Sequence, residues 1–345
     1  MVPVSGDERR VGRVLRTLGR AANRVTGKLG LVTVETSYLA ELRATVERLS
    51  LTVQPQPTAV TPSPASPPDL SASIVDTRLI SRLTDEYRSH PLARLTGLWD
   101  DRHAAAIPLT NFRGDSHFVW QRAAGEVNYL VTLLYVRSHD PHKLLDLIGE
   151  DGAYGAECLE FEGSLFSRDL LDSANEINFL LDELPLQHMG PLRIVDVGAG
   201  YGRLAHRLAT VVPEAELFCV DGIAVSTAVC DAYIRCRGLT SRINVVPLTR
   251  LESIPTPVLL ATNVHSFSEM SFEAVAWWLD WLVDIGVQYL FLVPNFPGPA
   301  LNDGRSLLGL LTSRGFEVWR TRDKYDDGLM EKYGLFPGVY YLLRR

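Results

Sequence analysis

The sequence predicts an α/β protein built on a seven-stranded, mostly parallel sheet with helices on both faces. Short apolar runs rich in β-branched residues alternate with helical patterns after Pro191. The first of these runs, residues 192–197, leads directly into a glycine-rich turn. The mainly helical pattern before this run predicts a helical cap in front of the sheet and, further upstream, an N-terminal helical extension.

Composition limits the classes of partner and location. Of 345 residues, 46% are hydrophobic, and no stretch approaches the roughly 18 uninterrupted apolar residues of a membrane span. The N-terminal residues contain no apolar signal core, so we expect a cytoplasmic protein. The net charge of −7 argues against a nucleic-acid partner. The four cysteines show no paired C-x-x-C spacing, so we expect reduced, mostly buried thiols.

Residues 1–51 form a predicted helical extension of basic character. The first 50 residues carry nine Lys/Arg and five Asp/Glu, and arginines recur at helical spacing from Arg9 to Arg24, mostly on a different face from the apolar residues. Such a helix suits the inner face of a membrane, an acidic partner or its own oligomer. Residues 35–51 continue with a heptad-like pattern that favours a homo-oligomer but is too short for a coiled coil by itself.

A linker and a helical cap come next along the chain. Residues 52–70 contain six prolines among Ser, Thr and Ala, a composition that keeps a segment extended. The cap or substrate region spans residues 71–186. It has predicted helices marked by Leu79, Leu83 and Tyr87, at 127–136 and at 173–184, with polar loops at 111–121 and 163–173.

The domain at residues 187–345 holds the sheet. Its seven predicted strands are residues 192–197, 216–221, 242–247, 258–263, 288–294, 316–321 and 338–343. Ligands of open α/β sheets lie beyond the carboxyl ends of the strands. The ends of the first, second and fourth strands are therefore the places to search for a site.

The first strand end is the glycine turn. Gly198, Gly200 and Gly202 allow positive φ and close approach of the backbone to a ligand. The spacing is not that of a dinucleotide fingerprint, because Arg203 stands where the third glycine would be. No Gly-Lys-Ser/Thr follows, which excludes a phosphate-binding P-loop.

The second strand ends in Asp221, 25 positions after Asp196. An ionised carboxylate at this place can accept two hydrogen bonds from the vicinal diol of a ribose. The alternative is an acid that only caps the helix beginning near Ser226.

The fourth strand is followed by four polar residues in a short passage: Asn263, His265, Ser266 and Glu269. Histidine suits general-base catalysis near neutral pH, so we expect His265 to be the base and Glu269 to orient it or to bind an acceptor hydroxyl. The alternative is that His265 and Glu269 only cap the helix that follows.

Three segments together resemble one known family. They are residues 167–173 (Ser-Arg-Asp-Leu-Leu-Asp-Ser) with 176–180, residues 197–205 (Val-Gly-Ala-Gly-Tyr-Gly-Arg-Leu-Ala), and residues 265–270 (His-Ser-Phe-Ser-Glu-Met). They resemble the bacterial sugar O-methyltransferase family, which belongs to the class I S-adenosylmethionine-dependent methyltransferases. The resemblance covers about residues 109–294 and implies a Rossmann-like sheet whose last strand is antiparallel to its neighbours.

The resemblance implies S-adenosylmethionine as cofactor and a sugar hydroxyl as acceptor, on a glycolipid, polysaccharide or glycosylated natural-product precursor. Ser266 and two aromatic residues, Trp120 and Tyr325, are the candidates for contact with the acceptor. The expected cofactor-binding residues are Arg168, Asp196, Gly198, Ala199, Gly200, Tyr201, Gly202, Asp221, Gly222 and Asn263, with Arg168 on the methionine carboxylate.

Two alternatives remain open at this point. A small-molecule O- or N-methyltransferase with a non-sugar acceptor would have the same cofactor half. An inactive cofactor-binding scaffold is the other alternative. No metal is expected, because the acids at 323, 326 and 327 and the histidines at 139 and 142 form no complete ligand pattern.

Overall fold

A computed structural model describes residues 74–94, 99, 101–114, 124–295, 298–301 and 303–345. The predicted extension, the linker and Trp120 lie outside the described residues. Within these residues, no helix combines the length and the apolar character that crossing a membrane requires.

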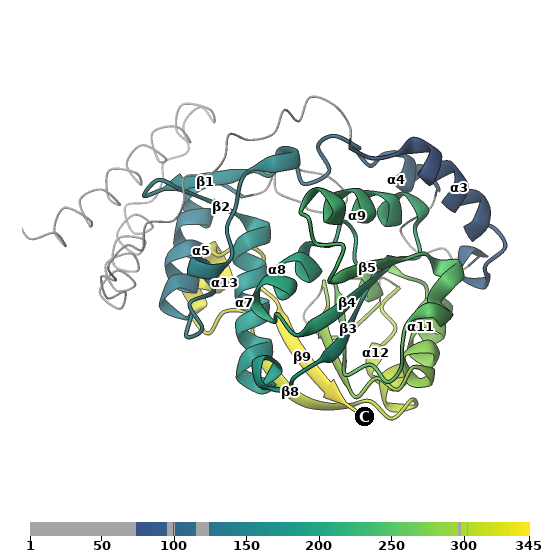
Figure 1. The fold of residues 1–345 in the computed structure, drawn as a ribbon. Coiled ribbons are helices and arrows are strands. Elements are labelled where there is room, and N and C mark those ends of the chain that lie inside the picture. The colour runs from purple at the N-terminus through teal and green to yellow at the C-terminus, as the bar shows by residue number, and fades with distance from the viewer. Residues whose placement is uncertain (1–73, 95–98, 100, 115–123, 296–297, 302) are drawn as a thin grey trace, which may run out of the picture.

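Seven strands form one sheet in the order β5-β4-β3-β6-β7-β9-β8 (Figure 1). Five are mutually parallel, and β9 lies between β7 and β8 and is antiparallel to both. Each predicted strand is confirmed to within two residues at either end. The strands are β3 (Leu192–Val197), β4 (Ala215–Val220), β5 (Ile243–Val246), β6 (Leu260–Val264), β7 (Tyr289–Val293), β8 (Glu317–Asp323) and β9 (Val339–Arg344).

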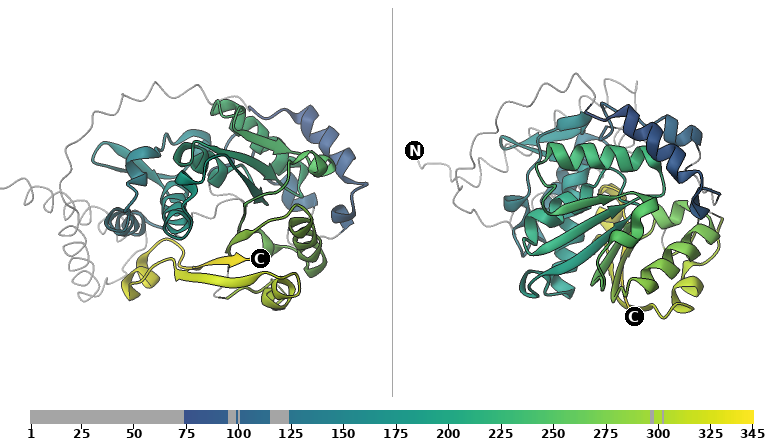
Figure 2. Two further views of the ribbon diagram at one scale, coloured as in Figure 1. Left: turned by 60° about the horizontal axis from the view of Figure 1, so that its bottom comes forward. Right: turned by 45° about the vertical axis from the view of Figure 1, so that its right-hand side comes forward.

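The strand order creates a switch point between β3 and β6. From β3 the chain moves outward through α8 (Arg203–Val211), β4, α9 (Ala224–Cys236) and β5. It then returns to β6 and moves the other way through α11 (Phe272–Asp284) to β7. Because such crossovers are right-handed, α8 and α9 cover one face and α11 the other, together with α12 (Leu307–Thr312) (Figure 2). The loops after β3 and β6 therefore diverge at their carboxyl ends and leave a crevice.

Helix α7 (Arg168–Glu183), which falls in the predicted cap, packs against the sheet, and the predicted domain boundary at residue 186 stays a prediction. Phe179 on α7 lies 5.6 Å from the ring of Phe291 on β7 and 5.5 Å from that of Tyr340 on β9. The helix begins five residues earlier than predicted, because the Ser167 side chain caps it by accepting from the Leu170 amide.

The predicted loop at 163–173 is also wrong. Its first part is one strand of a hairpin formed by β1 (Cys158–Phe161) and β2 (Ser164–Ser167). The turn residues Glu162 and Gly163 both have positive φ, as a two-residue hairpin of matching twist requires.

The remaining helices fall into two groups (Figures 1 and 2). Helices α3 (Thr77–Tyr87) and α4 (Asp101–Ala105), with the 3-10 turn η1 (Pro91–Arg94), lie beside α9. The Tyr87 hydroxyl fixes α3 by hydrogen bonds with Thr227 and the Leu248 amide. The second group lies along α7 and comprises α5 (Glu126–Ser138), α6 (Leu144–Leu147) and α13 (Gly328–Tyr333).

Short elements complete the described fold. They are η2 (Ala153–Gly155), η3 (Leu186–His188), η4 (Leu248–Ser253) and α10 (Ser266–Glu269). All four cysteines are free thiols. Cys219 and Cys230 are buried, whereas Cys236 is exposed at the end of α9.

Candidate active site

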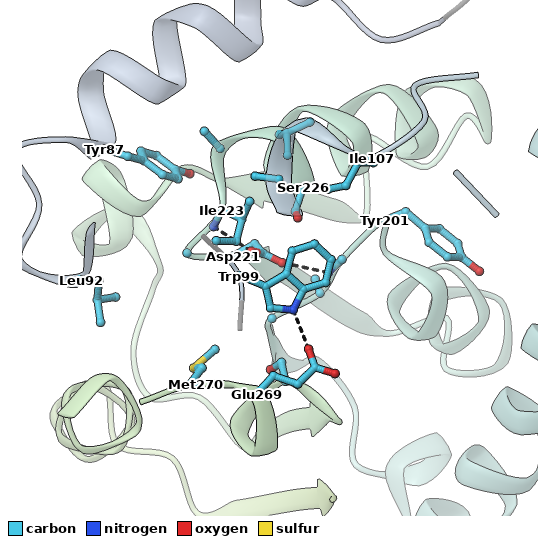
Figure 3. Close-up of a pocket in the computed structure, with 18 of the residues that line it drawn as sticks. Tyr87, Leu92, Trp99, Ile107, Tyr201, Asp221, Ile223, Ser226, Glu269 and Met270 are labelled. Carbon is cyan, nitrogen blue, oxygen red and sulfur yellow. Dashed lines mark hydrogen bonds between the residues drawn. The ribbon is translucent and has the colours of Figure 1, made fainter. Parts of the chain in front are cut away.

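A cavity of about 1060 Å³ opens at the switch point between β3 and β6 (Figure 3). Its floor is formed by the glycine turn (residues 198–202) and the residues that follow β4 and β6. Its opposite wall comes from α3, η1, Trp99, α4, Ile107 and Leu109, so the chain closes this cavity with segments that lie about 100 positions upstream.

Two glycines in the turn are required by close packing. Gly198 has φ +70°, and a Cβ there would lie 2.1 Å from the Ser266 hydroxyl oxygen. Gly202 has φ +87°, and a Cβ there would lie 2.9 Å from the Cys230 sulfur. The turn is thus held against the loop after β6 on one side and against α9 on the other.

Asp221 is fixed by the glycine turn itself. One carboxylate oxygen accepts from the Gly200 amide at 3.0 Å, and the other accepts from the Ile223 amide at 2.8 Å. Burial, with smaller contributions from Asp196 and Glu269, raises the pKa of Asp221 to about 7. Each oxygen has a further lone pair for a ligand hydroxyl. Beside it, a Cβ at Gly222 would meet nothing within 4 Å, so the cavity has room for a ribose there.

Asp196 and Tyr201 line the same cavity but have partners within the protein. Asp196 accepts from the Thr262 hydroxyl at 2.7 Å, and burial raises its pKa to about 6. The Tyr201 hydroxyl donates to Asp169, and Figure 3 shows this side chain directed away from Asp221. These two residues therefore position the turn, and Ala199 contributes its backbone and methyl group to the lining.

His265 follows β6 in a strained backbone conformation. Its φ is +68° and its ψ −37°, values rare for a residue other than glycine, and such strain concentrates at functional sites. His265 lines the cavity, and its Nδ1 is buried without a hydrogen-bond partner among the described residues. Burial, with Arg168 and Arg203 nearby, lowers the pKa of His265 to about 3. The ring is therefore neutral near neutral pH.

Glu269 bonds to two residues other than His265, and its two expected roles stay predictions. One of its oxygens accepts from the Trp99 indole Nε1 at 2.6 Å, and the other accepts from the Asn295 amide at 2.9 Å. Figure 3 shows the Trp99 ring lying across the centre of the cavity, between Glu269 and Asp221. Glu269 thus presents a carboxylate beside an aromatic ring.

Three predicted residues are not brought to the cavity. Arg168 donates to Asp172 at 3.1 Å and lies 3.7 Å from the centre of the Phe336 ring. Asn263 is fully buried, bonds to the Val197 carbonyl and the Phe267 amide, and so braces the loop after β6. The Tyr325 hydroxyl donates to the Leu335 carbonyl at 2.6 Å in the core. None of the three lines the described cavity, and their expected contacts with cofactor or acceptor stay predictions.

Ser266 does line the cavity, but its hydroxyl is engaged. It accepts from the Asn263 amide at 2.6 Å and donates to the Val197 carbonyl at 3.3 Å. Its contact with the turn at Gly198 gives it a positioning role, and its expected contact with the acceptor stays a prediction. Trp120, the other expected acceptor residue, lies outside the described residues.

Sequence reasoning missed Trp99 and Arg203 as residues of the cavity. Trp99 lies 170 positions before its partner Glu269, and no local pattern signals that pairing. In the sequence, Arg203 indicates only that the glycine spacing is not that of a dinucleotide motif. The described residues contain no cluster of three His, Cys, Asp or Glu side chains that could hold a metal ion.

Comparison with known proteins supports the fold. Residues 159–251, from β1 to η4 and including the glycine turn and Asp221, match the family described as the methyltransferase small domain. No curated protein matches the sequence. The match and the strand order together confirm the predicted Rossmann-like methyltransferase fold, and they are consistent with S-adenosylmethionine as cofactor.

Several solved structures are similar over about half of the chain. TrmK of M. capricolum, in complex with S-adenosylhomocysteine, is 13% identical over 48% of this chain and 67% of that chain, with a TM-score of 0.33. The cyclase SpnF is 19% identical over 51% and 83%, with a TM-score of 0.37. Magnesium protoporphyrin IX methyltransferase from Synechocystis, with bound S-adenosylmethionine, is 14% identical over 56% and 88%, with a TM-score of 0.37. Likeness at this level carries no argument about the acceptor.

Proposed function

We propose that this methyltransferase domain transfers a methyl group to a hydroxyl of a sugar-bearing acceptor. The observation that carries the proposal is one cavity with two different ends. Asp221 and the open floor at Gly222 suit a ribose at one end, and His265 lines the cavity after β6 on the other side of the glycine turn.

S-Adenosylmethionine, when bound, supplies a methyl group already activated by its sulfonium. The chain therefore needs only to align the acceptor oxygen and to remove its proton, and alignment alone contributes up to about 7–11 kcal/mol to lowering the barrier. His265 is the proposed base. Its neutral imidazole is weakly basic, but the acceptor oxygen becomes strongly acidic as its new bond to carbon forms. A weak base suffices to accept the proton at that stage.

Trp99, Glu269 and Asn295 support a sugar as the acceptor. The Trp99 ring lies across the cavity and offers an apolar face, and Glu269 stands at its edge with an acceptor oxygen for ring hydroxyls. Asn295 holds the other oxygen of that carboxylate. A sugar ring, which has apolar faces and hydroxyl groups around its edge, matches this combination of an aromatic face and a carboxylate.

A second candidate function has one observation in its favour. The wall opposite the glycine turn is largely aliphatic, formed by Ile80, Leu92, Ile107 and Leu109. This wall suits an apolar acceptor, such as a phenol or polyketide, or the apolar part of a glycosylated molecule. It does not by itself explain a carboxylate at the centre of the cavity.

A competition between acceptors tests the proposal. The full chain is incubated with S-adenosylmethionine and matched pairs of acceptors, each an aromatic compound with and without an attached sugar, and the methylated products are located by mass spectrometry. Methylation on the sugar supports the proposal. Methylation only on the sugar-free compound overturns it in favour of the second candidate. The predictions of cytoplasmic location and of membrane contact or self-association through residues 1–50 stay predictions.

A further inference from the structure

Arg203 is a charged residue of the cavity that the proposed reaction has not yet used. It is the first residue of α8, directly after Gly202, and it lines the same cavity as Gly198 and His265. Its side chain is 15% exposed. Arg203 therefore belongs to the floor of the cavity, next to the glycine turn.

The protein holds this guanidinium in one orientation. Its Nη1 donates to the Ser173 hydroxyl and to one oxygen of Glu176, both at 2.8 Å, and its Nη2 donates to the other oxygen of Glu176 at 3.0 Å. Glu176 is buried on α7, so the pair is bidentate and anchored. Of the five N–H groups of Arg203, Nε–H and one on Nη2 form no hydrogen bond with another described residue.

Position along the sheet indicates which part of a ligand meets Arg203. A ribose at Asp221 lies at the end of β4, and the acceptor base His265 lies at the end of β6. Because β3 lies between β4 and β6 in the sheet, the glycine turn and Arg203 at the start of α8 would hold the methionine part of the cofactor. Arg203 is the cation at that place.

Other arginines are less suited to the same task. Arg88 and Arg102 line the cavity from α3 and α4, on the opposite wall. Arg88 pairs with Asp85, and both side chains are largely exposed. Arg168, the residue expected from the sequence, pairs with Asp172 outside the cavity.

We propose that Arg203 binds the α-carboxylate of S-adenosylmethionine and of its product, an inference that rests on the proposed function. Arg203 thereby takes the role that the sequence assigned to Arg168. The anchoring by Glu176 and Ser173 reduces the ordering cost of the arginine when the ligand binds.

Two ligands that differ only in this carboxylate test the proposal. S-Adenosylhomocysteine and its decarboxylated analogue are titrated calorimetrically into the full chain and into Arg203→Met. The wild-type chain is expected to prefer S-adenosylhomocysteine by about 10- to 100-fold, the range for hydrogen bonds to a charged group. Arg203→Met is expected to lose this preference while binding the analogue to within about twofold of wild type.

Control variants separate ligand recognition from a structural role. Arg168→Met should keep the wild-type preference. If Arg203→Met does not fold, as judged by its melting temperature, Arg203→Lys replaces it in the test. The preference of Arg203→Lys for S-adenosylhomocysteine over the analogue should be smaller than that of wild type. An unchanged preference in the folded Arg203 variant, or equal weakening of both ligands, overturns the proposal. Absence of binding of both ligands by wild type overturns the proposed function and with it this inference.

Discussion

The two walls of the cavity differ in how they are built. The floor is made by backbone and short-range contacts: the glycine turn, Asp221 on the amides of Gly200 and Ile223, and Ser266 against Gly198. The opposite wall is made by side chains from α3, Trp99 and α4, which reach the floor through the bond of Trp99 to Glu269. The difference indicates a fixed cofactor half, common to the fold, and an acceptor half that is particular to this chain.

The largest expected effect comes from a substitution that disrupts the floor of the cavity. Gly198→Ala places a Cβ against the Ser266 oxygen at a positive φ, so we expect a loss of about 2–5 kcal/mol of unfolding free energy and no measurable binding of S-adenosylhomocysteine. Denaturant unfolding and calorimetry check both. Gly222→Ala is the matched control, since its Cβ meets nothing within 4 Å and its stability should not change. Equal stability of the two variants would contradict the close packing of the turn.

The next effect separates chemistry from cofactor binding. His265→Ala should reduce kcat by about 10²–10⁴-fold, the usual contribution of a general base. Affinity for S-adenosylhomocysteine should stay within about twofold, because the proposed role concerns the acceptor. Single-turnover kinetics with the acceptor found by the competition experiment provides the measurement. Near-normal turnover would remove His265 as the base.

A smaller expected effect is a pH dependence of cofactor affinity, which depends on the floor of the cavity and not on the opposite wall. The proposed ribose contact requires the ionised form of Asp221, whose pKa is raised to about 7 by burial. Affinity for S-adenosylhomocysteine should therefore rise about tenfold per pH unit below that pKa and level off above it. Asp221→Asn should remove most of this dependence, and what remains is expected from Asp196, with a pKa of about 6. A wild-type profile identical to that of Asp221→Asn would exclude the contact.

The same pKa shift has the opposite sign for folding. The folded chain binds the Asp221 proton more tightly than the unfolded chain does, where the pKa is about 3.9. The contribution of Asp221 to the unfolding free energy is thus greatest below about pH 4 and falls as the pH rises to about 7. Comparison of wild type and Asp221→Asn by denaturant unfolding across this window checks the direction. His265, with its pKa lowered to about 3, should add no dependence of kcat above about pH 5.

The smallest expected effect comes from substitutions of Trp99, on the wall opposite the glycine turn. Trp99→Phe keeps an aromatic face but removes the hydrogen bond to Glu269, whereas Trp99→Ala removes both. We expect Trp99→Ala to raise the KM for the acceptor by about 3- to 10-fold and Trp99→Phe by less, with cofactor affinity unchanged. Steady-state kinetics at saturating cofactor measures this. A change in cofactor affinity alone would place Trp99 in the cofactor half.

Sequence patterns predicted the floor because its signals are local. The seven strands carry continuous apolar runs, and the turn glycines and Asp221 occupy fixed places at strand ends. The hairpin of β1 and β2 escaped prediction because each strand has only four residues, too few for a clear alternation of apolar and polar residues. The helical pattern of α7 was assigned to a cap because its contact with Phe291 and Tyr340 depends on strands more than 100 positions later.

Site residues show the same division. Gly198, Gly202 and Asp221 have roles set by backbone geometry, and the pattern of the turn located them. Arg168, Asn263 and Tyr325 were chosen by residue type, but tertiary packing directs them to Asp172, the loop after β6 and the Leu335 carbonyl. Trp99 was invisible because its role arises from one long-range hydrogen bond.

Calorimetric titration of the full chain with S-adenosylhomocysteine tests the central claim most directly, with Asp221→Ala titrated in parallel. The structure predicts one molecule bound per chain and an affinity about 10- to 100-fold weaker in the variant, because hydrogen bonds to a charged carboxylate are lost. Absence of binding to the wild-type chain, or equal affinity of the two proteins, would contradict the assignment of this cavity to the cofactor.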